Sequence, residues 1–327
     1  MDQEPESSLS VALPLEASGF GMKEARHGAT ACSLAKKGDA VGSVGDQSVM
    51  ARVIENPNPR IQDPRPRPFI IGHRGASGEA PENTIAAFDL AMEQHADGIE
   101  CDVRLSKDGV PVIIHDATLR RTTSGHGRVR DRTAAELKQL DAGSWFNRRS
   151  PERADPRYAR EKIPTLAETL AWARSRPCLA YIEIKRGWLR YPGIEERVLA
   201  EIHRAAMLPL VTVISFDLPT LRRLRRMDRQ IALGIDFTRP LAAVRLARSI
   251  GASAVLPRAR FTSRLSIVRC QQAGLAVVVW DVEQVRSMRR QAAAGVDGII
   301  TGHPGNLAAL QMHIRDAPGS MDWRVRD

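Results

Sequence analysis

From residue 69 onward the chain alternates short apolar runs with segments of helical periodicity. Ile85, Phe88 and Met92, for example, follow the first run at i, i+3 and i+7. Continuous apolar strands separated by helices predict a parallel sheet covered by helices. Eight or so repeats over about 245 residues favour an α/β fold closed as a (β/α)8 TIM barrel over an open doubly wound sheet. No GxGxxG follows the first run, which argues against dinucleotide binding. The apolar runs cover residues 69–72, 98–103, 110–115, 179–185, 210–216, 231–235, 254–256, 275–280 and 298–301.

Nine runs compete for eight places in such a barrel, and the third run is the expected exception. Only about six residues separate the run at 110–115 from the run at 98–103, which is too short for a parallel crossover. The two runs should therefore form an antiparallel hairpin, and Asp108-Gly109 is a strong turn pair. A turn centred on this pair places His115 roughly opposite Asp102.

Polar residues occupy the ends of four of these runs. Glu100 and Asp102 are two apart on one strand and share a face, as do Glu183 and Lys185. Charged side chains in apolar central strands are costly unless they are paired or bound to a metal. A barrel gathers the ends of its strands at one rim, so a single site is predicted there. Its members are His73, Arg74, Glu100, Asp102, His115, Glu183 and Lys185.

The residue types of this set point to phosphate chemistry. Three carboxylates suit an oxygen-seeking divalent cation, Mg²⁺ or Ca²⁺, better than zinc. Arg74 and Lys185 suit a phosphate, and His73 with His115 suit proton transfer in both directions. Together they predict metal-assisted cleavage of a phosphate ester.

The net charge of +10 raises the question of nucleic acid, because 41 of the 48 basic residues are arginine. These arginines are dispersed without an aromatic ladder between them, which argues against a nucleic-acid site. The densest cluster, at 221–227, is expected to be an amphipathic helix with its basic face in water. No window of eighteen consecutive apolar residues exists, so no stable membrane insertion is expected.

The two ends of the chain are expected to lie outside the barrel domain, which is assigned to residues 68–313. Residues 1–67 read as a disordered N-terminal extension with five prolines between 56 and 68, and 314–327 as a flexible tail. Met50 is a candidate natural start. The first residues are acidic and lack an export signal, and the four cysteines are scattered, so a cytoplasmic location is expected.

The order of the motifs carries a family resemblance. The motifs are HRG (73–75), PENT (81–84), GIECDV (98–103), DGVPVIIHD (108–116), TLRRTTSGHG (118–127), DAGSWF (141–146), IPTLAE (163–168), EIK (183–185), ISF (214–216), Trp280 and GVDGII (295–300). Together they closely resemble the glycerophosphodiester phosphodiesterases of the short cytosolic bacterial type, over about residues 68–312.

The resemblance implies a (β/α)8 barrel that hydrolyses deacylated phospholipids, such as glycerophosphocholine, to sn-glycerol 3-phosphate and an alcohol. It implies a small insertion after the third strand, at about 117–162. The implied metal ligands are Glu100, Asp102 and Glu183, the acid–base pair is His73 and His115, and the phosphate contacts are Arg74 and Lys185. Trp145, Phe146, Phe216 and Trp280 are candidates for an apolar wall beside the glycerol or for simple packing.

One departure and several alternatives stay open. The family usually carries Thr-Asp after the last strand, where this chain has Thr301-Gly302 followed by His303. The change could alter the local turn, the glycerol contacts or the surroundings of the metal. A lysophospholipase D, which would want an apolar mouth, and a non-catalytic phosphate-binding barrel are the alternatives. Headgroup, metal, oligomeric state, the order of the two histidines and the nucleophile (water or a glycerol hydroxyl) are undecided.

Overall fold

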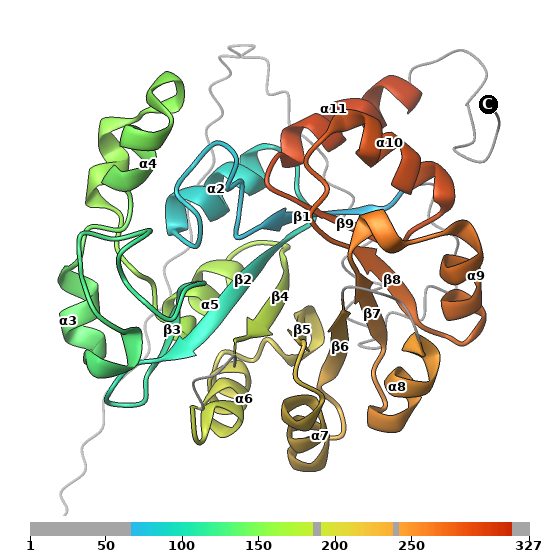
Figure 1. The fold of residues 1–327 in the computed structure, drawn as a ribbon, viewed down its shortest axis with the longest axis horizontal. Coiled ribbons are helices and arrows are strands. Elements are labelled where there is room, and N and C mark those ends of the chain that lie inside the picture. Colours follow the sequence, from blue (N-terminus) through green and yellow to red (C-terminus); the bar gives the residue numbers. More distant parts are fainter. Residues whose placement is uncertain (1–66, 186–190, 238–241, 316–327) are drawn as a thin grey trace, which may run out of the picture. The chain divides into compact units, whose positions relative to one another are not determined.

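The computed structural model describes residues 67–185, 191–237 and 242–315. The predicted extension at 1–67 lies outside this part except for its last residue, and most of the predicted tail at 314–327 also lies outside it. Eight parallel strands form a ring at the centre of the described part (Figure 1). They are β1 (Phe69–His73), β2 (Gly98–Leu105), β4 (Leu179–Ile184), β5 (Val211–Ser215), β6 (Ala232–Phe237), β7 (Ala254–Pro257), β8 (Ala276–Val279) and β9 (Gly298–Thr301).

The ring closes through β1, which pairs in parallel with β2 on one side and β9 on the other. The register places His73 beside Glu100 across the β1–β2 pair. It places Asp102 beside Glu183 across the β2–β4 pair. The predicted (β/α)8 barrel is therefore confirmed, and strand pairing alone brings the ends of β1, β2 and β4 together.

The ninth strand, β3 (Pro111–Ile113), pairs antiparallel with β2 outside the ring, as predicted for the hairpin. The predicted register was wrong by one residue, because Val103 pairs with Ile113 and the backbone N–H of Ile114 donates to Asp102 O at 2.9 Å. The loop has three residues instead of two: Ser106 N donates to Val110 O, and Gly109 adopts a left-handed φ of 75°.

Helices follow the strands and cover the outer face of the ring (Figure 1). Thr84 caps α2 by accepting from Ala87 N, and Thr165 with Glu168 forms a capping box at α5. Helix α10 begins at Val285, after Asp281 turns the chain with a φ of 65°. The α-helices are α2 (Ile85–Glu93), α3 (Ala134–Gln139), α4 (Ser144–Arg149), α5 (Leu166–Arg174), α6 (Ile194–Arg204), α7 (Leu218–Met227), α8 (Ala243–Ile250), α9 (Arg264–Gln272), α10 (Val285–Ala294) and α11 (Pro304–Arg315).

Three apolar clusters hold the domain together. The largest lies between the ring and its helices, and a smaller one, which includes Ile71, Ile214 and Leu256, fills the inside of the ring. A third cluster includes Leu119 and Leu137 and belongs to the insertion that carries α3 and α4. Among the described residues, no helix is long and apolar enough to cross a membrane.

Candidate active site

The turn after β1 places His73 and Arg74 at the rim of the barrel. Arg74 and Gly75 both adopt left-handed φ angles, of 54° and 81°. A Cβ at Gly75 would lie 2.5 Å from the backbone carbon and oxygen of Ala87, so only glycine allows α2 to approach this closely. The turn aims the Arg74 guanidinium inward, where Nη1 donates to Glu82 Oε1 at 2.9 Å and Nε lies 3.2 Å from Asp102 Oδ2.

Glu100, Asp102 and Glu183 meet inside the rim as predicted from their spacing. One oxygen from each carboxylate lies within 4.8 Å of those of the other two, and all three side chains are buried. Glu100 Oε2 accepts from Arg74 N at 3.0 Å, and Asp102 Oδ2 accepts from Asn83 Nδ2 at 2.7 Å. This set of three carboxylates is called the acidic trio below.

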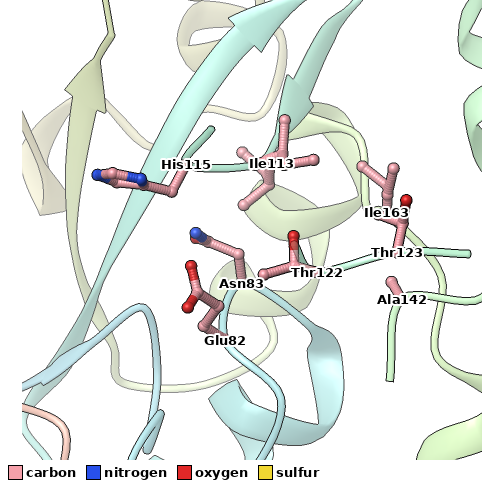
Figure 2. Close-up of a pocket in the computed structure, with 9 residues that line it drawn as sticks. Glu82, Asn83, Ile113, His115, Thr122, Thr123, Ala142 and Ile163 are labelled. Carbon is pink, nitrogen blue, oxygen red and sulfur yellow. The ribbon is translucent and has the colours of Figure 1, made fainter. Parts of the chain in front are cut away.

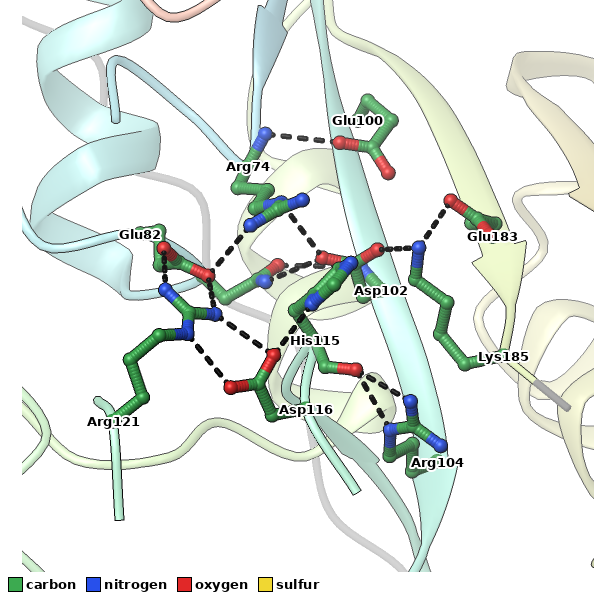
Figure 3. Close-up of polar contacts among 11 residues, drawn as sticks. Arg74, Glu82, Glu100, Asp102, Arg104, His115, Asp116, Arg121, Glu183 and Lys185 are labelled. Atoms are coloured by element: carbon green, nitrogen blue, oxygen red, sulfur yellow. Dashed lines mark hydrogen bonds and ion pairs between the residues drawn. The ribbon is translucent and has the colours of Figure 1, made fainter. Parts of the chain in front are cut away.

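Two cations partly neutralise the acidic trio (Figure 3). Lys185 Nζ lies 2.7 Å from Glu183 Oε2 and 3.0 Å from Asp102 Oδ1, and Arg74 lies on the other side of Asp102. Burial disfavours the ionised form of Asp102, but Lys185 and Arg74 overcome it and lower its pKa. Two positive side chains thus face three carboxyl groups.

The two glutamates of the acidic trio lack that full compensation. Burial, followed by the negative charges of Asp102 and Glu183, raises the pKa of Glu100 well above its ordinary value. Burial also raises the pKa of Glu183, although Lys185 acts against it. A buried, oxygen-only cluster of three carboxylates with residual negative charge fits a hard divalent cation. Asp102 Oδ1 is buried, and its partner among the described residues is Lys185 Nζ, in the ion pair of 3.0 Å.

His115 follows β3 and is fixed from two directions. Its Nδ1 lies 2.7 Å from Asp116 Oδ1, and its carbonyl oxygen accepts from Arg104 Nε at 2.8 Å and Nη2 at 2.6 Å. An Nδ1–H donated to Asp116 leaves Nε2 for proton transfer. Burial lowers the pKa of His115, and burial together with Arg74 lowers that of His73 to about 4.

The surroundings of His73 differ from those of His115. Side-chain atoms of His73, Asp281 and Glu283 approach one another within 4.8 Å, and Asp281 forms an ion pair of 2.8 Å with Arg258. The structure thus gives each histidine a carboxylate neighbour, and the proposed acid–base roles stay predictions.

The predicted aromatic wall divides into two places. Phe216, 50% exposed, meets Trp280 edge to face with ring centroids 5.7 Å apart, after β5 and β8 respectively. Phe146 is buried in the insertion, where it contacts Trp145 and Tyr158. Among the four candidates, therefore, only Phe216 and Trp280 follow barrel strands at the rim.

Gly302, which stands where the resemblance implies an aspartate, lies next to the carboxylate of another residue. Gly302 N donates to both oxygens of Glu283, at 3.1 and 3.2 Å, and a Cβ at Gly302 would lie 3.0 Å from Glu283 Oε2. His303 pairs with Glu79 at 3.1 Å rather than with a member of the acidic trio. The loop after β8 thus places a carboxylate against the position where the resemblance implies an aspartate.

Several polar residues of the site were not predicted from the sequence. Asn83 and Glu82 lie in PENT and Asp116 ends VIIHD, so these motifs contained the signal, but their contacts depend on how loops meet. Asp236, at the end of β6, is 5% exposed, and its Oδ2 has no hydrogen-bond partner among the described residues. Burial and the charge of Glu183 raise its pKa. Its position at the end of an apolar strand resembles that of Glu183 and was a usable signal.

Comparisons with known proteins agree with this chemistry. Residues 73–306 match the family model described as the glycerophosphoryl diester phosphodiesterase family. A glycerophosphodiester phosphodiesterase of Caldanaerobacter subterraneus subsp. tengcongensis is 39% identical over 243 residues, which make up 74% of this chain and 97% of that protein.

Solved structures share the fold. A glycerophosphodiester phosphodiesterase of Agrobacterium tumefaciens is 32% identical, with a TM-score of 0.65, covering 74% of this chain and 99% of its own. A phosphodiesterase of Oleispira antarctica, solved in complex with the product sn-glycerol-3-phosphate, is 28% identical, with a TM-score of 0.67 and coverage of 75% and 97%.

Proposed function

Because this chain belongs to the glycerophosphoryl diester phosphodiesterase family and is a phosphoric diester hydrolase, we propose that it cleaves deacylated phospholipids such as glycerophosphocholine and glycerophosphoethanolamine. The products are sn-glycerol 3-phosphate and the headgroup alcohol. The observation that carries the proposal is the acidic trio, with its oxygens within 4.8 Å, flanked by Arg74 and Lys185. That arrangement suits an anionic phosphodiester held on a divalent cation.

The acidic trio would hold Mg²⁺ or Ca²⁺ through Glu100, Asp102 and Glu183. A cation bound there would draw negative charge from the phosphodiester oxygens. Arg74 and Lys185 orient the phosphoryl group, since both cations already point at Asp102 between them.

His73 and His115 divide the proton transfers. One histidine takes the proton of the attacking water or glycerol hydroxyl while the new P–O bond forms. The other gives a proton to the headgroup oxygen as the old P–O bond breaks. His115 is prepared for either role, because Asp116 holds its Nδ1 side and leaves Nε2 for the substrate.

The experiment is a coupled assay for glycerol 3-phosphate release from several glycerophosphodiesters, with Mg²⁺, with Ca²⁺ and with chelator. We expect turnover with a divalent cation and a loss of 10²- to 10⁴-fold in kcat for His115→Ala. His126→Ala, an exposed histidine in the insertion, is the matched control and should keep full activity. Chelator-insensitive turnover would contradict the metal assignment, and an unchanged His115→Ala variant would remove His115 from the chemistry.

A lysophospholipase D activity is a second candidate, favoured by the exposed Phe216 beside Trp280 at the mouth of the barrel. The same assay with lysophosphatidylcholine, read as choline release, separates the two. A higher kcat/KM for the lysolipid than for glycerophosphocholine would establish the second candidate. The non-catalytic alternative is set aside, because residues 73–306 match a family model described as phosphodiesterases and the chain keeps both His73 and His115.

A cytosolic location also remains a proposal. It is supported by the scattered cysteines, of which Cys101, Cys178 and Cys270 are buried free thiols. Cys32 lies outside the described residues.

A further inference from the structure

Arg121, in the insertion, connects two parts of the site that come from different strands (Figure 3). Its Nη1 and Nη2 donate to the two oxygens of Glu82 at 2.6 and 2.8 Å. Its Nε and Nη2 donate to the two oxygens of Asp116 at 2.7 and 3.1 Å. One guanidinium thus makes four hydrogen bonds to two carboxylates.

Each of those carboxylates holds a residue of the predicted chemistry. Glu82 Oε1 also accepts from Arg74 Nη1 at 2.9 Å, and Asp116 Oδ1 lies 2.7 Å from His115 Nδ1. A continuous chain of contacts therefore runs from the phosphate-binding arginine after β1 to the histidine after β3, and Arg121 is its middle member.

The segment that carries Arg121 is itself fixed. Leu119, two residues earlier, is buried in the apolar cluster of the insertion, and Thr123 Oγ1 donates to Leu119 O at 2.6 Å. Thr122 and Thr123 line a cavity of about 10 Å³ whose other wall includes Glu82 and His115 (Figure 2). The turn after Arg121 thus packs directly behind the site.

We propose that Arg121 is a positioning residue that holds Arg74 and His115 in register through Glu82 and Asp116. It acts on the acid–base group and on the phosphate-binding group at once without touching the substrate. The inference deepens the proposed function and rests on it for the roles of Arg74 and His115.

The ionisation of the partners agrees with this role. Burial opposes ionisation of Glu82 and Asp116, but hydrogen bonds from Arg121 prevail and lower the pKa of both carboxyls, that of Asp116 to about 2. A planar guanidinium can serve two carboxylates on different edges, whereas an ammonium offers a single nitrogen. Lysine at position 121 should therefore keep the charge but lose the connection.

The experiment compares Arg121→Ala and Arg121→Lys with Arg120→Ala, the exposed neighbouring arginine, in the full-length chain. The first measurement is the affinity for inorganic phosphate by calorimetry with Mg²⁺ present, which reports on Arg74 without any turnover. The second is kcat for glycerophosphocholine, which reports on His115. We expect about tenfold weaker phosphate binding and at least a tenfold lower kcat for both Arg121 variants, and no change for Arg120→Ala.

Chemical rescue distinguishes positioning from folding. Millimolar guanidinium should restore phosphate affinity and part of kcat to Arg121→Ala, and should do nothing for Arg120→Ala. If Arg121→Ala is too unstable to study, Arg121→Lys carries the test. Phosphate affinity within twofold of wild type in Arg121→Lys, or losses in Arg121→Ala that guanidinium leaves untouched, would overturn the proposal. The affinity measurement requires no turnover. A wild-type chain that binds phosphate but leaves glycerophosphocholine intact would therefore refute the proposed substrate, while the phosphate affinities of the variants would still test the role of Arg121.

Discussion

Replacing Glu100 with glutamine should weaken the dependence of this protein's stability on divalent cations. Glu100 is buried, and its Oε2 accepts from Arg74 N at 3.0 Å, a bond that a glutamine oxygen can keep. Glu100→Gln therefore removes one negative charge from the acidic trio with little change of shape.

The size of the effect follows from the geometry. Two carboxylate charges within 4.8 Å of each other repel by at least about 3.5 kcal/mol at an effective dielectric constant of 20. Arg74 and Lys185 offset most of this, so the metal-free variant should be more stable than metal-free wild type by on the order of 1 kcal/mol.

A bound cation reverses that order. A cation at 100 times its Kd stabilises the wild type by about 2.7 kcal/mol, which raises the Tm of a domain of this size by about 5 °C. A tenfold loss of affinity in Glu100→Gln reduces the rise to about 3 °C or less.

The pH dependence has a definite sign. The pKa of Glu100 is raised above its ordinary value of 4.5, so its contribution to metal-free stability is present below that pH and is lost as the pH rises through the folded-state pKa. A cation binds the ionised form, so the increase in Tm on adding Mg²⁺ or Ca²⁺ should grow with pH over the same range.

The assay is thermal unfolding with chelator, with Mg²⁺ and with Ca²⁺. Glu195→Gln is the matched control, because Glu195 is also a buried glutamate but lies on α6 and bonds Thr220 and Arg223. The control should keep the full cation-dependent rise whatever its own stability. A full rise in Glu100→Gln, or none in the wild type, would refute the assignment of the acidic trio as the metal site.

Three further predictions follow from other parts of the structure. Gly75→Ala should destabilise the protein by more than about 3 kcal/mol in denaturant unfolding, because the new Cβ would clash with Ala87. Gly127→Ala, at a similar φ but with no atom within 4 Å of the new Cβ, should cost only about 1–2 kcal/mol. Equal costs in the two variants would contradict the clash. The pKa of Asp116 is lowered from 3.8 to about 2, so its stabilising contribution is present above pH 4 and is lost as the pH falls toward 2. That contribution is about 1 kcal/mol after allowance for solvent screening. Acid unfolding of Asp116→Asn should lack this loss of stability, and identical acid unfolding curves for variant and wild type would exclude it. Phe216→Ala should raise KM for glycerophosphodiesters severalfold with kcat nearly unchanged in the coupled assay, and an unchanged KM would show that the ring is not part of the substrate wall.

Strand spacing was sufficient to predict the barrel and to bring the acidic trio together. Glu100 and Asp102 lie on one face of β2 because strand residues alternate, and parallel pairing places Asp102 beside Glu183. The hairpin was also predictable, but its register was not, because Asp108-Gly109 is equally compatible with a two-residue turn and with the three-residue loop that forms.

Contacts between loops could not be predicted in this way. Arg121, Glu82 and Asp116 lie in three segments without regular periodicity, so spacing gives no information on whether their side chains meet. The sequence shows Arg120 and Arg121 side by side, and only the fold distinguishes the exposed one from the one that joins two carboxylates.

The insertion enters and leaves the barrel at nearly the same point. Ile113 N donates to Pro164 O at 2.8 Å, and Val112 forms an isolated antiparallel β-bridge with Thr165. The last residues of β3 therefore lie against the residues that lead into α5. Because its two ends lie together, the insertion can be exchanged between relatives, by recombination or by protein engineering, without a change in the path of the barrel strands. On the proposal for Arg121, a transplanted insertion without an arginine at that position would leave the barrel folded but Arg74 and His115 poorly aligned.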